Sequence, residues 1–596
     1  MLSQTLVNVS MGREPADLVI KNGQWVCVQS GEILAHTDIA IAAGHIAYVG
    51  EDASHTIGQH TRVIDAGGSF LVPGLLDAHM HVESGMVTVT EFVRAVAIRG
   101  TTGMFVDPHE IANVFGLKGV KLMVDEAAVQ PIHVWVQMPS CVPSAPGMET
   151  PGASITPEDV AEAMTWPGII GLGEMMNFPG VINTDPKLHA EMTATRKAGK
   201  VISGHYPVPD LGLPFHGYVA GGAEDDHEGT RPEDAIARVR QGMKPMLRYG
   251  SAWFDVASQL SAITEKHLDA RHFLLCTDDS HAETLASEGH MDRVLRHAIS
   301  HGLAPLSAIQ MATLNTAEHF GLSREIGQIA PGRWADVLIV DDLTDFHPRV
   351  VIARGVEIAR DQHLLVDLPP YIYPAWATES VRLGRELSSD DFRIPAPAGE
   401  RHALCHVIGV IENHAPTQHL KLEVPILNGE LHVSTSTHHH NEVDLAKLAL
   451  VERHNATGRV TLGLVSGFGL RGPCAIASTV VHDSHQMIVA GTDDACMALA
   501  ANWLAENNGG QVVVKDGKII GEVRLPIAGL MSKEPVGIVA HEAASVLAGF
   551  KACGCHLNNP NMQLSLLALV VIPELRLSDK GLVDVTKFEF ISLIEE

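Results

Sequence analysis

The sequence predicts an α/β protein with a parallel (β/α)₈ barrel of the TIM type at its centre. A small β-domain built from both flanks of the barrel and a further α+β domain at the C-terminus accompany it. Three observations carry this prediction. Short apolar runs alternate with helical patterns over about 250 residues, the usual size of such a barrel. Segments with alternating or clustered β-branched residues, typical of strands, lie before and after this region. A proline-marked break then precedes a final part of mixed texture, and 596 residues suffice for three or four domains.

The small β-domain is predicted from residues 1–70 together with 330–368. Residues 18–26 and 38–49 alternate or cluster β-branched residues around turns that contain glycine. A similar pattern of β-branched residues occurs in two later segments, 335–340 and 349–358. Two separated stretches of one type indicate a single domain into which the barrel is inserted.

The barrel is predicted over residues 71–321, with eight βα units. The sixth strand has the weakest signal, because its segment is short and acidic. The predicted strands are 71–78, 102–107, 133–138, 169–173, 201–204, 222–226, 244–248 and 272–277. The clearest helical stretches between them are 91–99, 112–129, 185–198, 231–241 and 252–268.

The C-terminal α+β domain is predicted over residues 375–596. Pro369, Pro370 and Pro374 mark the linker that precedes it, and the segment 392–399 is a second break. The predicted strands of this domain are 458–465 and 511–523, and its predicted helices are 494–506 and 536–548. The run from His438 to His440 looks like a tag, but it is internal and its flanks look structured.

Composition excludes several classes of protein. The net charge of −28 argues against a nucleic-acid-binding surface, which needs a basic patch. No run of about 18 uncharged apolar residues occurs, and the N-terminus lacks the apolar region of a signal peptide, so we expect a cytoplasmic enzyme with no membrane partner. Eight cysteines do not make a disulfide framework. Cys553 and Cys555 form a CxC pair without a second pair, which does not predict a zinc site.

Histidine is unusually frequent: 34 residues, more than the 15 Phe, 7 Trp and 6 Tyr together. In a (β/α)₈ barrel the catalytic groups lie at the carboxyl ends of the strands. His79 and His81 end the first predicted strand, and residues i and i+2 of a strand point the same way. Six metal-ligand side chains follow strand ends in this manner: His79, His81, Glu174, His205, His227 and Asp278. Each alone is a weak signal, but together they predict a metal site.

Sequence motifs add a resemblance. VPGLLDAHMH, the Asp after strand eight and the late PGRWADVLIVD segment resemble the amidohydrolase superfamily, whose barrels sit beside a small β-domain built from both chain ends. DAHMHVESGMVT, VDPHEIANV, GLGEMMNFPGV, SGHYP and LCTDDSH resemble the bacterial adenine deaminases. ERHNATGR, VSGFGL, VHDSHQMIVAGTDD and VIPELRLSDKGLVDV in the last third resemble the same family, so the resemblance covers most of the chain.

The resemblance implies two divalent cations per chain. One would bind His79, His81 and Asp278, the second would bind His205 and His227, and Glu174 would bridge them. Manganese or iron(II) is favoured by the resemblance, although the ligand types also suit zinc. The implied reaction is hydrolysis of adenine to hypoxanthine and ammonia, a step of purine salvage or adenine catabolism. Asp278 would act as general base and then acid, and Glu174 as the second catalytic carboxylate.

Four further residues are candidates for binding the purine base: Glu83, His109, Ser280 and His281. The first two are equally compatible with supporting a metal ligand, as outer carboxylates often do, and Glu110 is a weaker candidate of the same kind. The run from His482 to His485 does not predict a Ser/His/Asp triad, because triad members are usually distant in sequence. It is instead interpreted as a polar turn or as part of a wall that closes the active site.

Three other functions compete with adenine deamination on the sequence alone. The nearest is an amidohydrolase that cleaves a cyclic amide or another aminated heterocycle with the same metal centre. A barrel that serves as a non-catalytic scaffold is disfavoured, because all six ligand positions are filled. The signature of nucleic-acid-editing deaminases, H-x-E with P-C-x-x-C, is absent. We also expect a homo-oligomer, with a dimer favoured.

Overall fold

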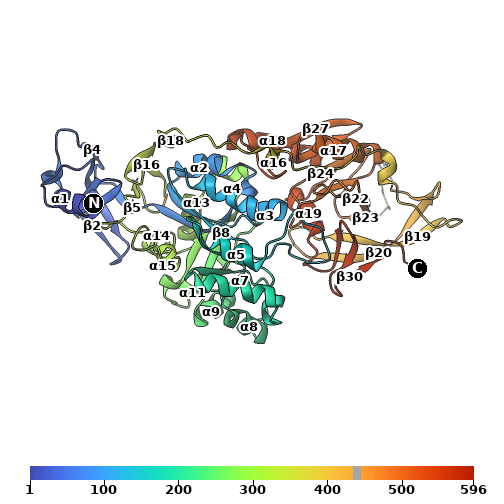
Figure 1. Cartoon of the computed structure of the whole chain (residues 1–596), viewed down its shortest axis with the longest axis horizontal. Helices are drawn as coiled ribbons and strands as arrows, with labels where there is room; N and C mark the ends of the chain where they lie inside the picture. The colour runs from blue at the N-terminus through green and yellow to red at the C-terminus, as the bar shows by residue number, and fades with distance from the viewer. Residues whose placement is uncertain (434–443, 596) are drawn as a thin grey trace.

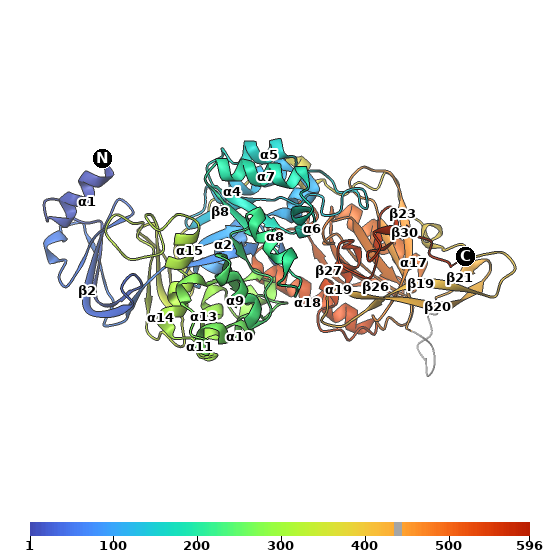
Figure 2. The same cartoon turned by 90° about the horizontal axis from the view of Figure 1, so that it is seen from below.

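A computed structural model describes residues 1–433 and 444–595 of the chain. Figures 1 and 2 show three parts in a row along the long axis: an N-terminal β-rich part, a central α/β part and a C-terminal part. The run His438 to His440 lies outside the described residues. Among the described helices, none combines the length and the apolar character needed to cross a membrane.

The two flanks of the barrel form one nine-stranded sheet. Its order is β18-β17-β16-β15-β5-β1-β2-β3, with β4 paired to β1. The antiparallel pairing of β5 with β15 joins the N-terminal strands to those that follow the barrel. The strands are β1 (Leu18–Cys27), β2 (Glu32–Ala42), β3 (His45–Gly50), β4 (Arg62–Asp65), β5 (Phe70–Pro73), β15 (Val337–Val340), β16 (Pro348–Ala353), β17 (Val356–Arg360) and β18 (His363–Leu364).

The central part is the parallel barrel. One sheet has the order β10-β9-β8-β7-β6-β14 and a second has the order β11-β12-β13. Strands β13 and β14 are consecutive and join the two sheets on one side. On the other side the backbone N–H of Glu224 donates to the carbonyl of Ile202 at 2.9 Å. The strands are β6 (Leu75–His81), β7 (Thr101–Val106), β8 (His133–Met138), β9 (Ile169–Met175), β10 (Val201–Gly204), β11 (Asp225–Asp226), β12 (Lys244–Arg248), β13 (Leu274–Cys276) and β14 (Asp278–Asp279).

Helices surround this barrel (Figure 1), and most contribute a buried face to the largest apolar core. The helices are α2 (Val89–Ala97), α3 (His109–Phe115), α4 (Leu117–Ala127), α5 (Pro157–Ala163), α6 (Phe178–Ile182), α7 (Pro186–Lys197), α8 (Leu213–Gly221), α9 (Pro232–Arg240), α10 (Val256–Gln259), α11 (Ser261–Thr264), α12 (Ala282–Ser287), α13 (Met291–Ser300), α14 (Pro305–Met311) and α15 (Leu314–His319).

The first barrel strand differs from its prediction. The segment 71–78 is not one strand: Phe70–Pro73 belongs to the small sheet, and the barrel strand starts at Leu75 and includes both histidines. Gly74 separates the two at a point of close approach, where a Cβ would lie 2.0 Å from Oγ1 of Thr102. Only glycine allows the chain to pass from the sheet into the barrel there.

Three β-rich segments are hairpins: 38–49, 349–358 and 511–523. Turns that contain glycine are expected in the first of these, whereas the last differs from the single strand predicted there. Each turns at a residue followed by glycine, and both turn residues have positive φ: Ala43-Gly44, Arg354-Gly355 and Asp516-Gly517. This is the geometry of a two-residue hairpin of the I′ type, whose twist matches that of the flanking strands.

Two predicted barrel helices also differ. The stretch 112–129 is two helices, α3 and α4, which meet at Gly116 with φ of 60°. The stretch 252–268 contains only the short helices α10 and α11.

The C-terminal part contains a second nine-stranded sheet, with the order β21-β20-β19-β23-β22-β25-β24-β26-β27. All its pairs are antiparallel except that of β19 with β23. Its strands are β19 (His402–Val410), β20 (Thr417–Leu427), β21 (Glu430–Leu431), β22 (Ala446–Val451), β23 (Val460–Ser466), β24 (Cys474–Ser478), β25 (Met487–Gly491), β26 (Gly510–Lys515) and β27 (Lys518–Arg524).

Two long helices cover opposite faces of this sheet. Ala449 and Val489 pack in one core with α17 (Asp494–Glu506), whereas their neighbours Leu448 and Ile488 pack in another with α18 (Val536–Ala552). Alternation along the strands explains the division, since successive side chains point to opposite faces. The core on the α18 side is continuous with the core around the barrel. The remaining α-helices and strands are α1 (Leu2–Ser10), α16 (Ala375–Thr378), α19 (Pro560–Ser565), β28 (Leu575–Ser578), β29 (Gly581–Asp584) and β30 (Glu589–Ile591).

Candidate active site

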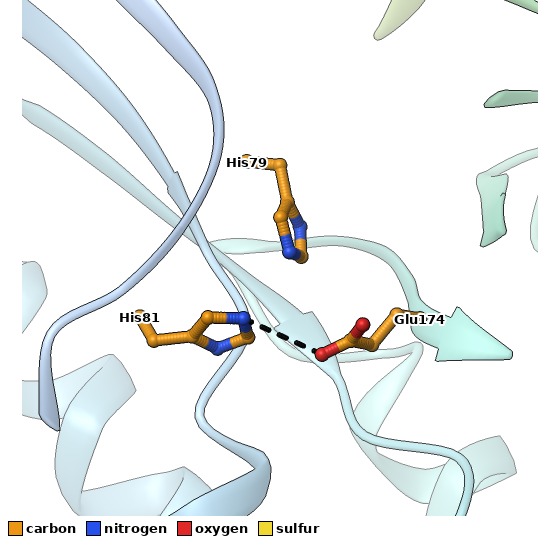
Figure 3. Close-up of side chains that lie close together, drawn as sticks. All are labelled: His79, His81 and Glu174. Carbon is orange, nitrogen blue, oxygen red and sulfur yellow. Dashed lines mark ion pairs between the residues drawn. The ribbon is translucent and has the colours of Figure 1, made fainter. Parts of the chain in front are cut away.

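The six predicted ligand side chains meet at the carboxyl end of the barrel. They form three overlapping groups whose ligand atoms lie within 4.8 Å of one another: His79, His81 and Glu174; His79, His227 and Asp278; Glu174, His205 and His227. Figure 3 shows the first group, with both imidazoles and the carboxylate pointing toward one centre. Five of the six are buried, and His205 is half-buried.

Glu174 lies between two sets of imidazoles. Its Oε1 is 3.4 Å from Nε2 of His81, and its Oε2 is 2.5 Å from Nδ1 of His205 and 3.2 Å from Nε2 of His227. Each carboxylate oxygen therefore faces a different group of imidazoles, as a bridging ligand requires.

Asp278 is brought to the cluster by its backbone. It pairs with Met80 of β6, between the two histidines, and its φ of 60° lies in the left-handed region that a non-glycine residue rarely adopts. Its Oδ1 lies 3.3 Å from Nε2 of His81 and 3.8 Å from Nε2 of His79. The strained residue thus turns its carboxylate toward the strand-one imidazoles.

The carboxylates of the cluster are ionised, whereas its imidazoles differ. Burial lowers the pKa of His81, His205 and His227, but the neighbouring carboxylates of Glu110, Glu228 and Glu174 respectively contribute to raising it above its ordinary value overall. Burial raises the pKa of Asp278, but His81, His227 and Arg248 outweigh burial and hold that pKa well below its usual range. Burial likewise opposes ionisation of Glu174, and His205 and His109 more than compensate, so its pKa is also low. Burial keeps the pKa of His79 well below normal, which leaves its imidazole neutral.

Unpartnered polar atoms supply the test of whether a metal fits. Within residues 1–433 and 444–595, neither ring nitrogen of the fully buried His79 has a hydrogen-bond partner. A buried polar atom without a partner is costly, so such an atom needs an explanation. Imidazole nitrogens beside two carboxylates are a suitable donor set for divalent cations of the manganese, iron and zinc group. The residues therefore fit the implied metal.

Supporting side chains that the sequence analysis did not single out hold this cluster. Asp107, at the end of β7, accepts the backbone N–H of Glu174 at 2.7 Å, and its own carbonyl lies 2.8 Å from Nδ1 of His81. Arg248, at the end of β12, contacts Asp278. Asp107 and Arg248 both lie at the carboxyl ends of barrel strands, as the predicted ligands do. Their positions in the sequence are therefore the signal that could have pointed to them.

The four predicted substrate-binding residues lie in three different surroundings. Glu83 and His281 line a cavity of about 440 Å³ together with Glu110, whose Oε2 lies 3.8 Å from Nδ1 of His81. The six ligand side chains are not themselves among the residues that line it. His109 instead lies within the cluster, with Nδ1 3.2 Å from Oε1 of Glu174. Ser280 is buried and is not among the side chains that line this cavity.

The C-terminal part supplies the other wall of the cavity, including Asn413, His482, Gln511 and Asn558. It is tied to the barrel loops by backbone hydrogen bonds: Ser532 N–H donates to the carbonyl of Met86 at 2.8 Å, and Thr88 N–H donates to that of Ser532 at 3.1 Å. The cavity is therefore shared between barrel and C-terminal part. Cys553 and Cys555 are buried free thiols.

Comparison with known proteins is consistent with this architecture. The Amidohydrolase family matches residues 70–362, and the Adenine deaminase C-terminal domain matches residues 414–589. An adenine deaminase of Mesorhizobium japonicum is 61% identical over 99% of this chain and 96% of its own length. Adenine deaminase 3 of Rhizobium meliloti is 58% identical over 100% and 98%, and the adenine deaminase of Moorella thermoacetica is 50% identical over 100% and 98%. The chain belongs to the adenine deaminase family of the amidohydrolases.

Proposed function

We propose that this protein hydrolyses adenine to hypoxanthine and ammonia at a centre of two divalent cations. The observation that carries the proposal is the convergence of six ligand side chains at the carboxyl end of the barrel, next to a cavity whose lining residue Glu110 lies 3.8 Å from His81. The six are His79, His81, Glu174, His205, His227 and Asp278. Their identities suit a binuclear site, and relatives at 50–61% identity carry the name adenine deaminase. Manganese or iron(II) is the expected metal, with zinc as the further option.

The divalent cations would activate a water molecule as a nucleophile near neutral pH. The water oxygen bonds to C6 of adenine, and Asp278 accepts a proton from it. Asp278 then delivers that proton to the exocyclic amino nitrogen. The C6–N bond breaks, ammonia leaves with its electron pair, and the remaining proton of the water passes from the oxygen to ring N1, so that C6 becomes the carbonyl carbon of hypoxanthine.

Glu83 and His281 are the residues that we propose to contact the base from the barrel side, because both line the cavity. Glu83 is anchored for this role: its Oε1 lies 3.3 Å from the backbone N–H of Ile111, and its Oε2 has no partner among the described residues. His109, which contacts Glu174, is assigned to orienting that carboxylate.

A substrate panel tests the proposal. Ammonia release is measured with adenine, adenosine and guanine, and ring opening is measured with a set of cyclic amides. We expect turnover of adenine to exceed that of every other compound by a large factor. Preferential turnover of a cyclic amide would instead support the alternative amidohydrolase function. The expected homodimer and cytoplasmic location remain predictions, which light scattering and cell fractionation would test.

A further inference from the structure

His482 belongs to the C-terminal part and reaches the catalytic cavity from the side opposite the barrel. It lines the cavity together with Glu83 and Glu110. Its ring centroid lies 6.5 Å from that of His109, whose Nδ1 is 3.2 Å from the carboxylate of Glu174. A base with its reacting carbon at the metal cluster would therefore extend past His109 toward His482.

The side chain and the backbone of His482 each have a polar contact. Asp483 Oδ1 lies 3.5 Å from Nδ1 of the ring, and the backbone N–H of His482 donates to Oγ of Ser565 at 3.1 Å. The side chain of Asp483 is only 5% exposed, and that of His482 is 16% exposed. A buried carboxylate at this position fixes the orientation of the ring and favours a proton on it. The ring is thus held ready to donate a hydrogen bond.

The charged side chains around His482 also favour a protonated ring. Burial lowers the pKa of His482, but Asp483 and then Glu110 and Asp279 raise it above its ordinary value overall. The unprotonated ring nitrogens of a purine base are hydrogen-bond acceptors, so a protonated imidazole complements them. Glutamine and asparagine side chains complete this wall, at Asn413, Gln511 and Asn558.

We propose that His482, held by Asp483, is a substrate-positioning residue that donates a hydrogen bond to a ring nitrogen of the bound base. The inference rests on the proposed function, because it takes the cavity to be the binding site for adenine. It assigns the C-terminal part a role in substrate recognition in addition to its packing on the barrel.

The test uses the full-length, metal-loaded enzyme with His482→Ala and His482→Gln. A hydrogen bond to a charged donor is worth about 1.5–3 kcal/mol, so we expect Ala to raise KM for adenine by roughly tenfold or more. The Gln variant keeps an N–H donor and should recover most of the loss. The Kd for hypoxanthine, measured by calorimetry, should change in parallel. Asp483→Asn should give an intermediate increase in KM.

His541→Ala is the matched control, because His541 is exposed on α18 of the same part. It should leave KM, Kd and melting temperature unchanged. A His482→Ala variant with wild-type KM and a lowered melting temperature would show a purely structural role and overturn the inference. Failure of the wild-type enzyme to convert adenine would instead overturn the proposed function, and the inference with it.

Discussion

Arg248 donates a hydrogen bond from Nη1 to Oδ2 of Asp278 at 2.9 Å. The other oxygen of the same carboxylate, Oδ1, faces Nε2 of His81 at 3.3 Å. One oxygen of Asp278 is therefore held by the arginine, while the other is directed into the cluster. The guanidinium also donates from Nε to Asp255 at 2.6 Å and contacts Glu228. A single buried cation thus supports three carboxylates.

The first prediction concerns this arginine. Arg248→Met leaves Asp278, Glu228 and Asp255 without their shared cation. Breaking a buried ion pair from one side costs about 3–5 kcal/mol, so we expect a clearly lower melting temperature and reduced kcat. Arg248→Lys keeps the charge but loses the planar fork, and should show a smaller loss. A Met variant with wild-type melting temperature and kcat would contradict this account.

The second prediction concerns Asp278 as the proton-transferring group. Asp278→Asn keeps the shape of the side chain but cannot accept a proton, and it is a poorer ligand for a cation. Proton transfer is typically worth 10²–10⁴-fold, so kcat should fall by at least about a hundredfold while circular dichroism stays unchanged. Asp269→Asn, an exposed site, is the control. Retention of more than about a tenth of wild-type kcat would exclude Asp278 as the base.

The third prediction concerns Glu174 as a bridge. Glu174→Gln removes a negative charge that faces both groups of imidazoles. The site of His205 and His227 then keeps only neutral ligands and should lose its ion, whereas the site with Asp278 should keep its metal better. We expect about one ion per chain after dialysis, measured by elemental analysis. A supporting carboxylate would instead lower affinity or activity only about 10–100-fold, and two tightly held ions would rule out the bridge.

The fourth prediction is a pH dependence of stability, away from the active site. Glu191 on α7 is buried, and Lys187 at 3.6 Å is its ion-pair partner. Burial raises the pKa of Glu191 to about 8, although Lys187 lowers it. A carboxyl whose pKa is higher in the folded state stabilises the fold at low pH, and this contribution is lost as pH rises through that folded pKa.

Glu191→Gln removes this ionisation. We therefore expect a melting temperature close to that of the wild type at pH 5 and above it at pH 9. The exposed Glu162→Gln is the matched control and should show no pH-dependent difference. An equal melting-temperature difference for Glu191→Gln at both pH values would contradict the raised pKa.

The sequence predicted the barrel and the convergence of its six ligand types, because the position of a residue at a strand end fixes where its side chain lies. Arg248 obeys the same rule, but a cationic side chain is not a metal-ligand type, so the rule alone does not identify it as part of the site. On the sequence alone the run from His482 to His485 fits either a polar turn or part of a wall that closes the active site, since its approach to the barrel depends on how the C-terminal part packs; His482 lines the cavity. Asp516-Gly517 is a typical pair for a hairpin turn, and both residues have positive φ. The β-rich pattern continues on both sides of this pair, which is why the pattern predicts one strand there.

The central claim is that two cations held by this chain carry out deamination of adenine. Titration of metal-free protein with manganese(II), with ammonia release from adenine recorded at each addition, tests it most directly. The account predicts no significant release without metal and a rise to a plateau at two ions per chain. Full activity of the metal-free protein, or a plateau at one ion, would contradict it.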